Sequence, residues 1–111
     1  MLQIQIIPHT GSDIFRVVVF VKDAKGNNID AYVSLIARLG SGNEAVFMMA
    51  PRARKISTVY PEGGSKFLHR IEKGVYVAQS KNKRLANVRE IVVMARVGKE
   101  RVEKTMRIAG N

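Results

Sequence analysis

The chain has 111 residues, of which 46% are hydrophobic and 25% are charged, with 19 lysines and arginines against nine acidic residues. A chain of this length buries enough surface to hold one hydrophobic core, and its apolar fraction excludes an intrinsically disordered protein. Because it has no cysteine and only two histidines, disulfides, cysteine-ligated metals and thiol nucleophiles are excluded, and little remains for histidine chemistry. We therefore expect a single domain, residues 1–111, that folds without a cofactor.

The start of the chain predicts a strand and not a targeting signal. Residues 2–7 alternate, and they lack both a basic region and a long apolar stretch. Apolar runs such as residues 17–21 are far shorter than the roughly 20 residues that a membrane span needs, so no span is expected. The compartment stays open: a virion or the cytoplasm if Met1 is the natural start, and an extracellular site if a signal was removed.

Apolar residues recur with a period of two along almost the whole chain, which is typical of β-strands. No helical spacing persists over three turns, so we predict no long helix. The expected strands are residues 2–7, 14–22, 31–39, 44–49, 56–60, 66–71, 75–80, 88–97 and 101–108.

Several of these strands carry more specific predictions. Residues 14–22 are apolar apart from Arg16 and the terminal Lys22, which indicates a central strand buried on both faces or nearly so. The alternation along 31–39 places Val33, Leu35, Ala37 and Leu39 on one face.

Turn residues predict two hairpins. Residues 23–28 contain Gly26 and Asn27, which accept positive φ, so a hairpin is expected between 14–22 and 31–39. Residues 61–65 predict another between 56–60 and 66–71.

Three segments are candidates for strands at the edge of a sheet. In 101–108, charged residues alternate with Val102, Met106 and Ile108, a pattern typical of an edge strand. The segments 2–7 and 44–49 have two open readings: pairing with a neighbouring subunit, or pairing inside the monomer, which we favour.

These elements together predict an all-β fold. Short strands at roughly ten-residue spacing favour a two-sheet antiparallel β-sandwich of about seven to nine strands, with a small barrel as the alternative.

Three stretches resemble bacterial and archaeal immunoglobulin-like domains. They are residues 15–35, with the sequence Asp23-Ala-Lys-Gly-Asn-Asn-Ile29 between two strands, residues 72–78 (Glu-Lys-Gly-Val-Tyr-Val-Ala), and residues 91–98. The resemblance implies an immunoglobulin-like sandwich, a structural, adhesive or assembly role, and a hydroxyl of Tyr76 that caps a chain reversal. It implies no catalytic residue. The basic, glycine-rich segment 52–65 departs from the family pattern.

The net charge of +10 lies entirely in residues 51–111, because the first 50 residues hold four basic and four acidic groups. Such a bias favours phosphates, anionic membranes or acidic proteins as partners. With few aromatic residues beside the charge, sequence-independent phosphate contact is favoured over base readout. The alternative is a solubilising surface, as in a thermophile rich in Lys and Arg. The candidate patch consists of Arg52, Arg54, Lys55, Lys66, Arg70, Lys81, Lys83, Arg84 and Arg89.

The residues offer little for catalysis or metal binding. Asp23, Asn27 and Asp30 are a conceivable calcium site, but Lys22 and Lys25 oppose it, and an aspartate that binds its own turn is favoured. No nucleophile or acid–base constellation accompanies them, so we expect neither an enzyme nor a metal site.

The sequence therefore favours a non-catalytic structural or assembly module, a component of a virion or surface appendage that self-associates or binds other protein subunits. The alternative is a basic nucleic-acid-binding β protein that uses a patch in residues 51–111.

Overall fold

A computed structural model describes residues 1–10, 15–40, 42, 44–49, 59–60, 64–65, 67–80, 85 and 87–108. Within these residues the protein is all-β and has no α-helix, as the periodicity predicted. The strands are β1 (Gln3–Thr10), β2 (Phe15–Lys22), β3 (Tyr32–Leu39), β4 (Glu44–Met49), β5 (Val59–Tyr60), β6 (Gly64–Ser65), β7 (Phe67–Glu72), β8 (Val75–Ser80), β9 (Val88–Val97) and β10 (Glu100–Arg107). The described part of the chain has no helix long and apolar enough to cross a membrane.

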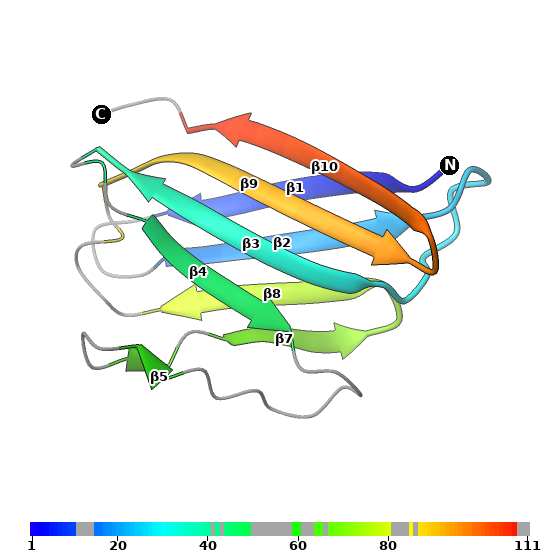
Figure 1. Ribbon diagram of the computed structural model, residues 1–111, viewed down its shortest axis with the longest axis horizontal. Coiled ribbons are helices and arrows are strands. Elements are labelled where there is room, and N and C mark those ends of the chain that lie inside the picture. Colours follow the sequence, from blue (N-terminus) through cyan, green and yellow to red (C-terminus); the bar gives the residue numbers. More distant parts are fainter. Residues whose placement is uncertain are drawn as a thin grey trace.

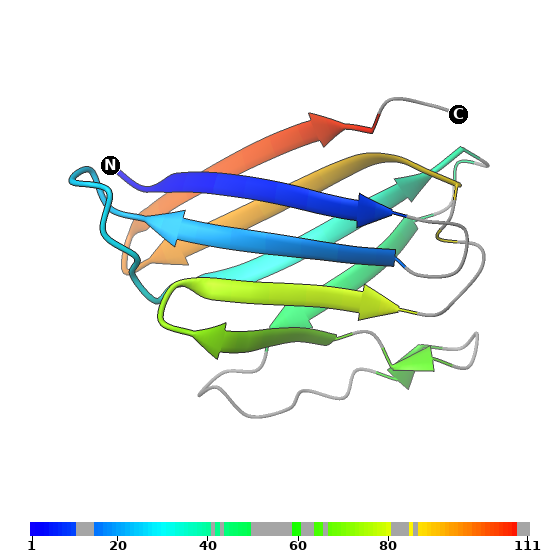
Figure 2. The ribbon, with the colours of Figure 1, turned by 180° about the vertical axis from the view of Figure 1, so that it is seen from behind.

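Eight strands form one hydrogen-bonded row that folds over into a sandwich. The order is β1-β2-β8-β7-β4-β3-β9-β10. The strands β1, β2, β8 and β7 form one layer, and β4, β3, β9 and β10 form the other (Figures 1 and 2). The layers join where β4 runs parallel to β7 for two residue pairs, and every other pairing in the row is antiparallel. This order is compatible with an immunoglobulin-type sandwich.

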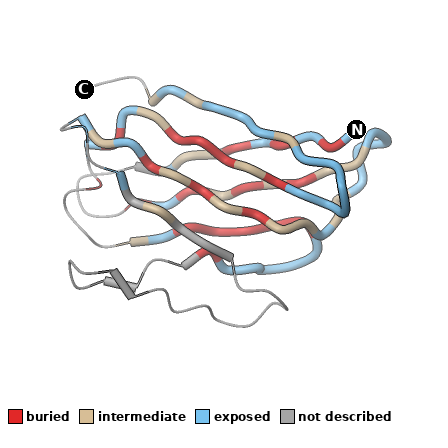
Figure 3. The backbone as a smooth tube through the Cα atoms, in the orientation of Figure 1, coloured by how far each residue is buried: buried red, intermediate tan, exposed pale blue. Residues whose placement is uncertain are grey.

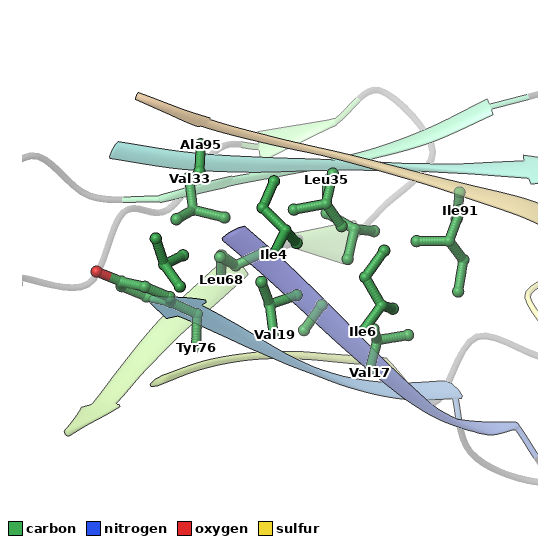
Figure 4. Packing of buried hydrophobic residues seen from close by; sticks show 14 of the residues in the cluster. Ile4, Ile6, Val17, Val19, Val33, Leu35, Leu68, Tyr76, Ile91 and Ala95 are labelled. Carbon is green, nitrogen blue, oxygen red and sulfur yellow. The ribbon is translucent and has the colours of Figure 1, made fainter. Parts of the chain in front are cut away.

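Fully buried residues alternate with more exposed ones along β2 and β3 (Figure 3). The core lies between the layers, where buried side chains of both layers meet (Figure 4). On β2 the inward residues Val17 and Val19 are fully buried, and they face Val33 and Leu35 of β3 across the sandwich. Together with Ala37, these β3 residues confirm the predicted inward face, and Leu39 packs against the same core. Burial of these apolar side chains stabilises the fold by about 1.5–3 kcal/mol for each large one.

The predicted hairpin between β2 and β3 is wrong. The strand β2 pairs with β1 and β8, whereas β3 pairs with β4 and β9 in the other layer. The turn at residues 23–27 does form, and Lys22 makes an isolated bridge to Asn28 before the chain crosses to the second layer. Turn residues specify a local reversal but do not specify which strand the chain then joins.

The second predicted hairpin, between residues 56–60 and 66–71, is also wrong in its pairing. The strand β5 pairs with the two residues of β6, Val59 with Ser65 and Tyr60 with Gly64, and not with β7. The strand β7 pairs instead with β8 and β4. Residues 56–58 of the predicted arm lie outside the described residues.

The two ends of the row, β1 and β10, approach each other across the open side of the sandwich. As predicted, β1 pairs within the monomer, with β2, and β10 is a terminal strand paired with β9. Side chains of β10 bind the backbone beside and within β1: Glu100 accepts a hydrogen bond from the Leu2 amide at 2.7 Å, and Lys104 donates one to the Ile4 carbonyl at 3.1 Å. We call this contact the seam.

Candidate functional site

The structure describes two of the nine residues of the predicted basic patch, Arg70 on β7 and Arg89 on β9. The other seven lie outside the described residues: Arg52, Arg54, Lys55, Lys66, Lys81, Lys83 and Arg84. Arg70 binds Asp30, just before β3 begins, whereas Arg89 lies against Gly40, just after β3 ends. Eight residues of extended strand separate these points, a distance of about 26 Å. Arg70 and Arg89 are therefore not parts of one patch.

Arg70 forms a two-pronged ion pair with Asp30 at the surface of the molecule. Its Nε and Nη2 donate to the two carboxylate oxygens of Asp30 at 2.9 and 3.0 Å, and the Gly74 amide donates to Oδ1 at 3.0 Å. The Arg70 guanidinium, followed by the Gly74 amide, lowers the pKa of Asp30 to about 2. Since Asp30 leads into one layer and Arg70 belongs to the other, this ion pair ties the layers together.

Tyr76 completes the same cluster from β8. Its side chain is fully buried. The Tyr76 hydroxyl accepts a hydrogen bond from the Ala31 amide at 2.9 Å and donates one to the Ala31 carbonyl at 3.2 Å. Burial raises the pKa of the hydroxyl. The tyrosine therefore anchors the crossover from β2 to β3, and we call Asp30, Ala31, Arg70, Gly74 and Tyr76 the interlayer latch.

Asp23 and Asp30 are engaged in structural contacts and do not form a joint site. Asp23 Oδ1 accepts hydrogen bonds from the amides of Lys25 at 2.9 Å and Asn27 at 3.0 Å, so the prediction of an aspartate that binds its own turn is confirmed. The amide of Asn27 lowers the pKa of this carboxyl. In the described ranges, no three His, Cys, Asp or Glu side chains are placed to hold a metal ion.

A groove lies at one end of the layer formed by β4, β3, β9 and β10, and three of these strands each contribute an arginine to it. It encloses about 420 Å³ and is lined by Arg38, Arg89, Glu90, Arg107 and Ile108. We call it the arginine groove. Cross-strand register explains it, because Arg38, Glu90 and Arg107 lie side by side on β3, β9 and β10.

Ion pairs organise one wall of the arginine groove. Arg38 donates to Glu90 at 2.6 Å and to Glu44 at 3.0 Å, and these contacts raise its pKa, with Glu44 the larger cause. Nε of Arg107 lies 3.9 Å from Oε2 of Glu90. The charge bias in residues 51–111 identified Arg89, but Arg38 and Arg107 were missed because only strand register brings them together.

The outer surface of the first layer has an apolar centre. Its members come from three strands and are adjacent by register, Ile7 opposite Val18, Val18 opposite Val77, and Phe20 opposite Val75. Val75 and Val77 are only 5% exposed, although they lie outside the inner core cluster, and Val18 and Phe20 are half-buried. We call these five residues the apolar outer face.

Polar and basic side chains surround this face. Arg16 and His9 lie at one end of it, and Lys22 lies at the other, with its Nζ 5.9 Å from the centre of the Phe20 ring. On β7 of the same layer, Ile71 lies in a bulge and is 59% exposed. An apolar centre with a polar rim is the usual composition of a protein–protein interface.

Comparison with known proteins gives no match to any family model, curated protein or solved structure. The resemblance to immunoglobulin-like domains therefore stays a prediction, and the functional argument depends on the residues themselves.

Proposed function

We propose that the protein is a non-catalytic assembly module, an immunoglobulin-like sandwich that contacts protein subunits as a component of a virion or surface appendage. One observation carries this proposal: at the centre of a four-stranded layer, the half-buried side chains of Ile7, Val18 and Phe20 keep part of their apolar surface exposed beside the buried Val75 and Val77. Apolar surface gains free energy of roughly 25 cal/mol per Å² when it is removed from water, so a partner that covers Val18 and Phe20 is stabilised.

The occupant that we propose is a second copy of this chain. The rim of the face includes Lys22 and Arg16 and, at its β7 side, the exposed carboxylate of Glu72 opposite Val75. Groups of both signs allow two copies to pair opposite charges while their apolar centres meet. The free strand edges are weaker candidates, because side chains of β10 already bind the backbone at β1 across the seam.

Light scattering coupled to size exclusion tests self-association. The wild type is expected to elute as a multiple of the 12.4 kDa monomer at both about 50 mM and about 500 mM salt, since apolar contacts are not weakened by screening. The variant Val18→Glu is expected to be monomeric, because it buries a charge in the interface.

The matched control is Ile36→Glu, which places the same charge at a half-buried aliphatic position on the outer face of the other layer. It is expected to leave the oligomer intact. A monomeric wild type, or equal disruption by both variants at unchanged stability, would overturn the role of the apolar outer face.

The alternative is nucleic-acid binding through residues 51–111. Two features support it, the location of the net charge in that part of the sequence and the arginine groove. The same chromatography distinguishes it, because a high 260/280 nm absorbance ratio that falls at high salt would indicate bound nucleic acid. Since Arg70 already binds Asp30, we rank this function second.

A further inference from the structure

The arginine groove contains a backbone irregularity that changes the position of Arg89. Along the β3–β9 pairing, Arg38 lies opposite Glu90, but the next residue, Leu39, lies opposite Val88. Arg89 is therefore the extra residue of a β-bulge. Bulges redirect a side chain out of the regular alternation and are frequent beside functional sites.

Gly40 provides the space into which the redirected side chain fits. A Cβ atom at residue 40 would lie 3.1 Å from Nε of Arg89 and 3.6 Å from its Cζ, so the guanidinium lies close against the glycine. The backbone around it is fixed by two hydrogen bonds, from the Gly40 amide to the Asn87 carbonyl at 3.0 Å and from the Ile108 amide to the Arg89 carbonyl at 2.8 Å. Arg89 is thus pre-positioned at the groove.

Some charged side chains of the arginine groove have ion-pair partners within it, and others keep donors available. Glu90 is bound by Arg38 and approached by Arg107, and Arg38 also binds Glu44. Within the described part of the chain, no salt bridge involves Arg89, and the Arg107 side chain is 89% exposed. Two guanidinium groups therefore retain free donors facing one open groove.

We propose that the arginine groove binds a phosphate group, with Arg89 and Arg107 as its donors. A guanidinium presents a planar fork of N–H groups that suits an oxyanion, and the tetrahedral oxygens of phosphate accept from two arginines that approach from different strands. The site lies on the second layer and does not depend on the proposed assembly function.

The phosphate has two possible sources, a free phosphate ion and the backbone of a nucleic acid, and they share the same recognition chemistry. The groove is open, so a phosphate carried by a chain has access to it. The net charge of +10 also raises the local concentration of either ligand.

The test follows the arginine Nε–Hε signals of ¹⁵N-labelled protein during titration with inorganic phosphate, at constant ionic strength set by chloride. Saturable shifts of Arg89 and Arg107 are expected, with an affinity that falls about tenfold or more in Arg89→Gln. The variant Gly40→Ala keeps every charge but displaces the Arg89 side chain, so it is expected to weaken binding while chemical denaturation shows that it remains folded. The matched control is Arg101→Gln, which removes the same charge from an exposed position on β10 and is expected to bind normally.

A single-stranded oligonucleotide in place of phosphate identifies the source. If the protein binds both the oligonucleotide and inorganic phosphate, and Arg89→Gln weakens both, the natural ligand is a nucleic-acid backbone. If it binds inorganic phosphate alone, the natural ligand is a free ion. Equal shifts with chloride alone, or equal losses in Arg101→Gln and Arg89→Gln, would overturn the site. The monomeric Val18→Glu variant is expected to keep the phosphate response, so failure of the assembly proposal leaves this one intact.

Discussion

The hydroxyl of Tyr76 is hydrogen-bonded to the backbone of Ala31, 45 residues earlier in the chain, at 2.9 Å to the amide and 3.2 Å to the carbonyl. Tyr76 belongs to β8 in one layer, and Ala31 is the residue from which the chain enters β3 in the other. The bond therefore fixes the end of the crossover that connects the layers. The resemblance to immunoglobulin-like domains predicted a tyrosine that caps a chain reversal, and the bond found here caps a crossover between layers.

Removing this hydroxyl is expected to destabilise the fold. In Tyr76→Phe the Ala31 amide loses its partner in a partly buried position, which costs about 1–3 kcal/mol of unfolding free energy. Urea denaturation measures the change. The control is Tyr32→Phe on β3, whose ring lies 5.5 Å from the Arg96 guanidinium and whose loss of a hydroxyl is expected to cost less than about 0.5 kcal/mol. Equal losses of unfolding free energy in the two variants would show that the hydrogen bonds of the Tyr76 hydroxyl do not stabilise the fold.

Gly74 is expected to be the least replaceable of the described glycines. A Cβ there would lie 2.8 Å from the Ile29 amide nitrogen and 2.9 Å from the Val21 carbonyl oxygen, and the residue has φ of 73°. Gly74→Ala therefore combines backbone strain with a collision against the crossover.

The matched variant Gly26→Ala separates the two effects. Gly26 has φ of 86°, but a Cβ there meets nothing within 4 Å. Its substitution is expected to cost about 1–2 kcal/mol from strain alone. The collision is expected to add about 1–3 kcal/mol in Gly74→Ala. Similar urea midpoints for the two variants would contradict the close packing of Gly74 against residues 28–29.

Asp30 is expected to make stability depend on acid pH. Its pKa is lowered from 3.8 to about 2, first by Arg70 and then by the Gly74 amide, so the unfolded chain binds the proton more readily than the folded one. The stabilisation is complete above the unfolded pKa and is lost as the pH falls from about 4 through about 2. Because the Asp30 side chain is 50% exposed, screening limits this contribution to about 1 kcal/mol.

The comparison of Asp30→Asn with the wild type checks this dependence. Urea midpoints measured between about pH 5 and about pH 2 are expected to fall less steeply in the variant, because its side chain does not titrate. The control Glu103→Gln removes a carboxylate from the exposed face of β10. If Asp30→Asn and the wild type lost stability in parallel, the latch ion pair would not be the cause.

The strands themselves were predictable because alternation depends only on local sequence. The predicted bounds 75–80 and 88–97 agree with β8 and β9, and the inward face of β3 follows directly from the period of two. On β2, which was predicted to be buried on both faces or nearly so, only alternate residues are fully buried. The layer crossing after β2 was not predictable in the same way. It depends on Tyr76 and Gly74, which lie more than 40 residues away and contact residues 28–31 only in the folded protein.

The candidate sites show the same division. Charge composition identified Arg89, but the groove also needs Arg38 and Arg107, which join it through the pairing of β9 with β3 and β10. The bulge at Arg89 is a one-residue change of register, and no local signal in the sequence marks it. Strand pairing, and not composition, therefore separates Arg70 from Arg89 and creates the groove.

The seam is expected to protect the free edge of β1 from other chains. Lys104 reaches across from β10 to the Ile4 carbonyl at 3.1 Å, so it occupies a backbone acceptor that an incoming strand would use. Lys104→Ala is expected to reduce the unfolding free energy by less than about 1 kcal/mol, since the side chain is exposed, but to increase slow association measured by light scattering at low urea concentration. The control Lys99→Ala removes the same charge from the exposed turn between β9 and β10. Faster association in both variants would point to lost net charge, whereas an effect confined to Lys104→Ala would locate the cause at the uncovered edge.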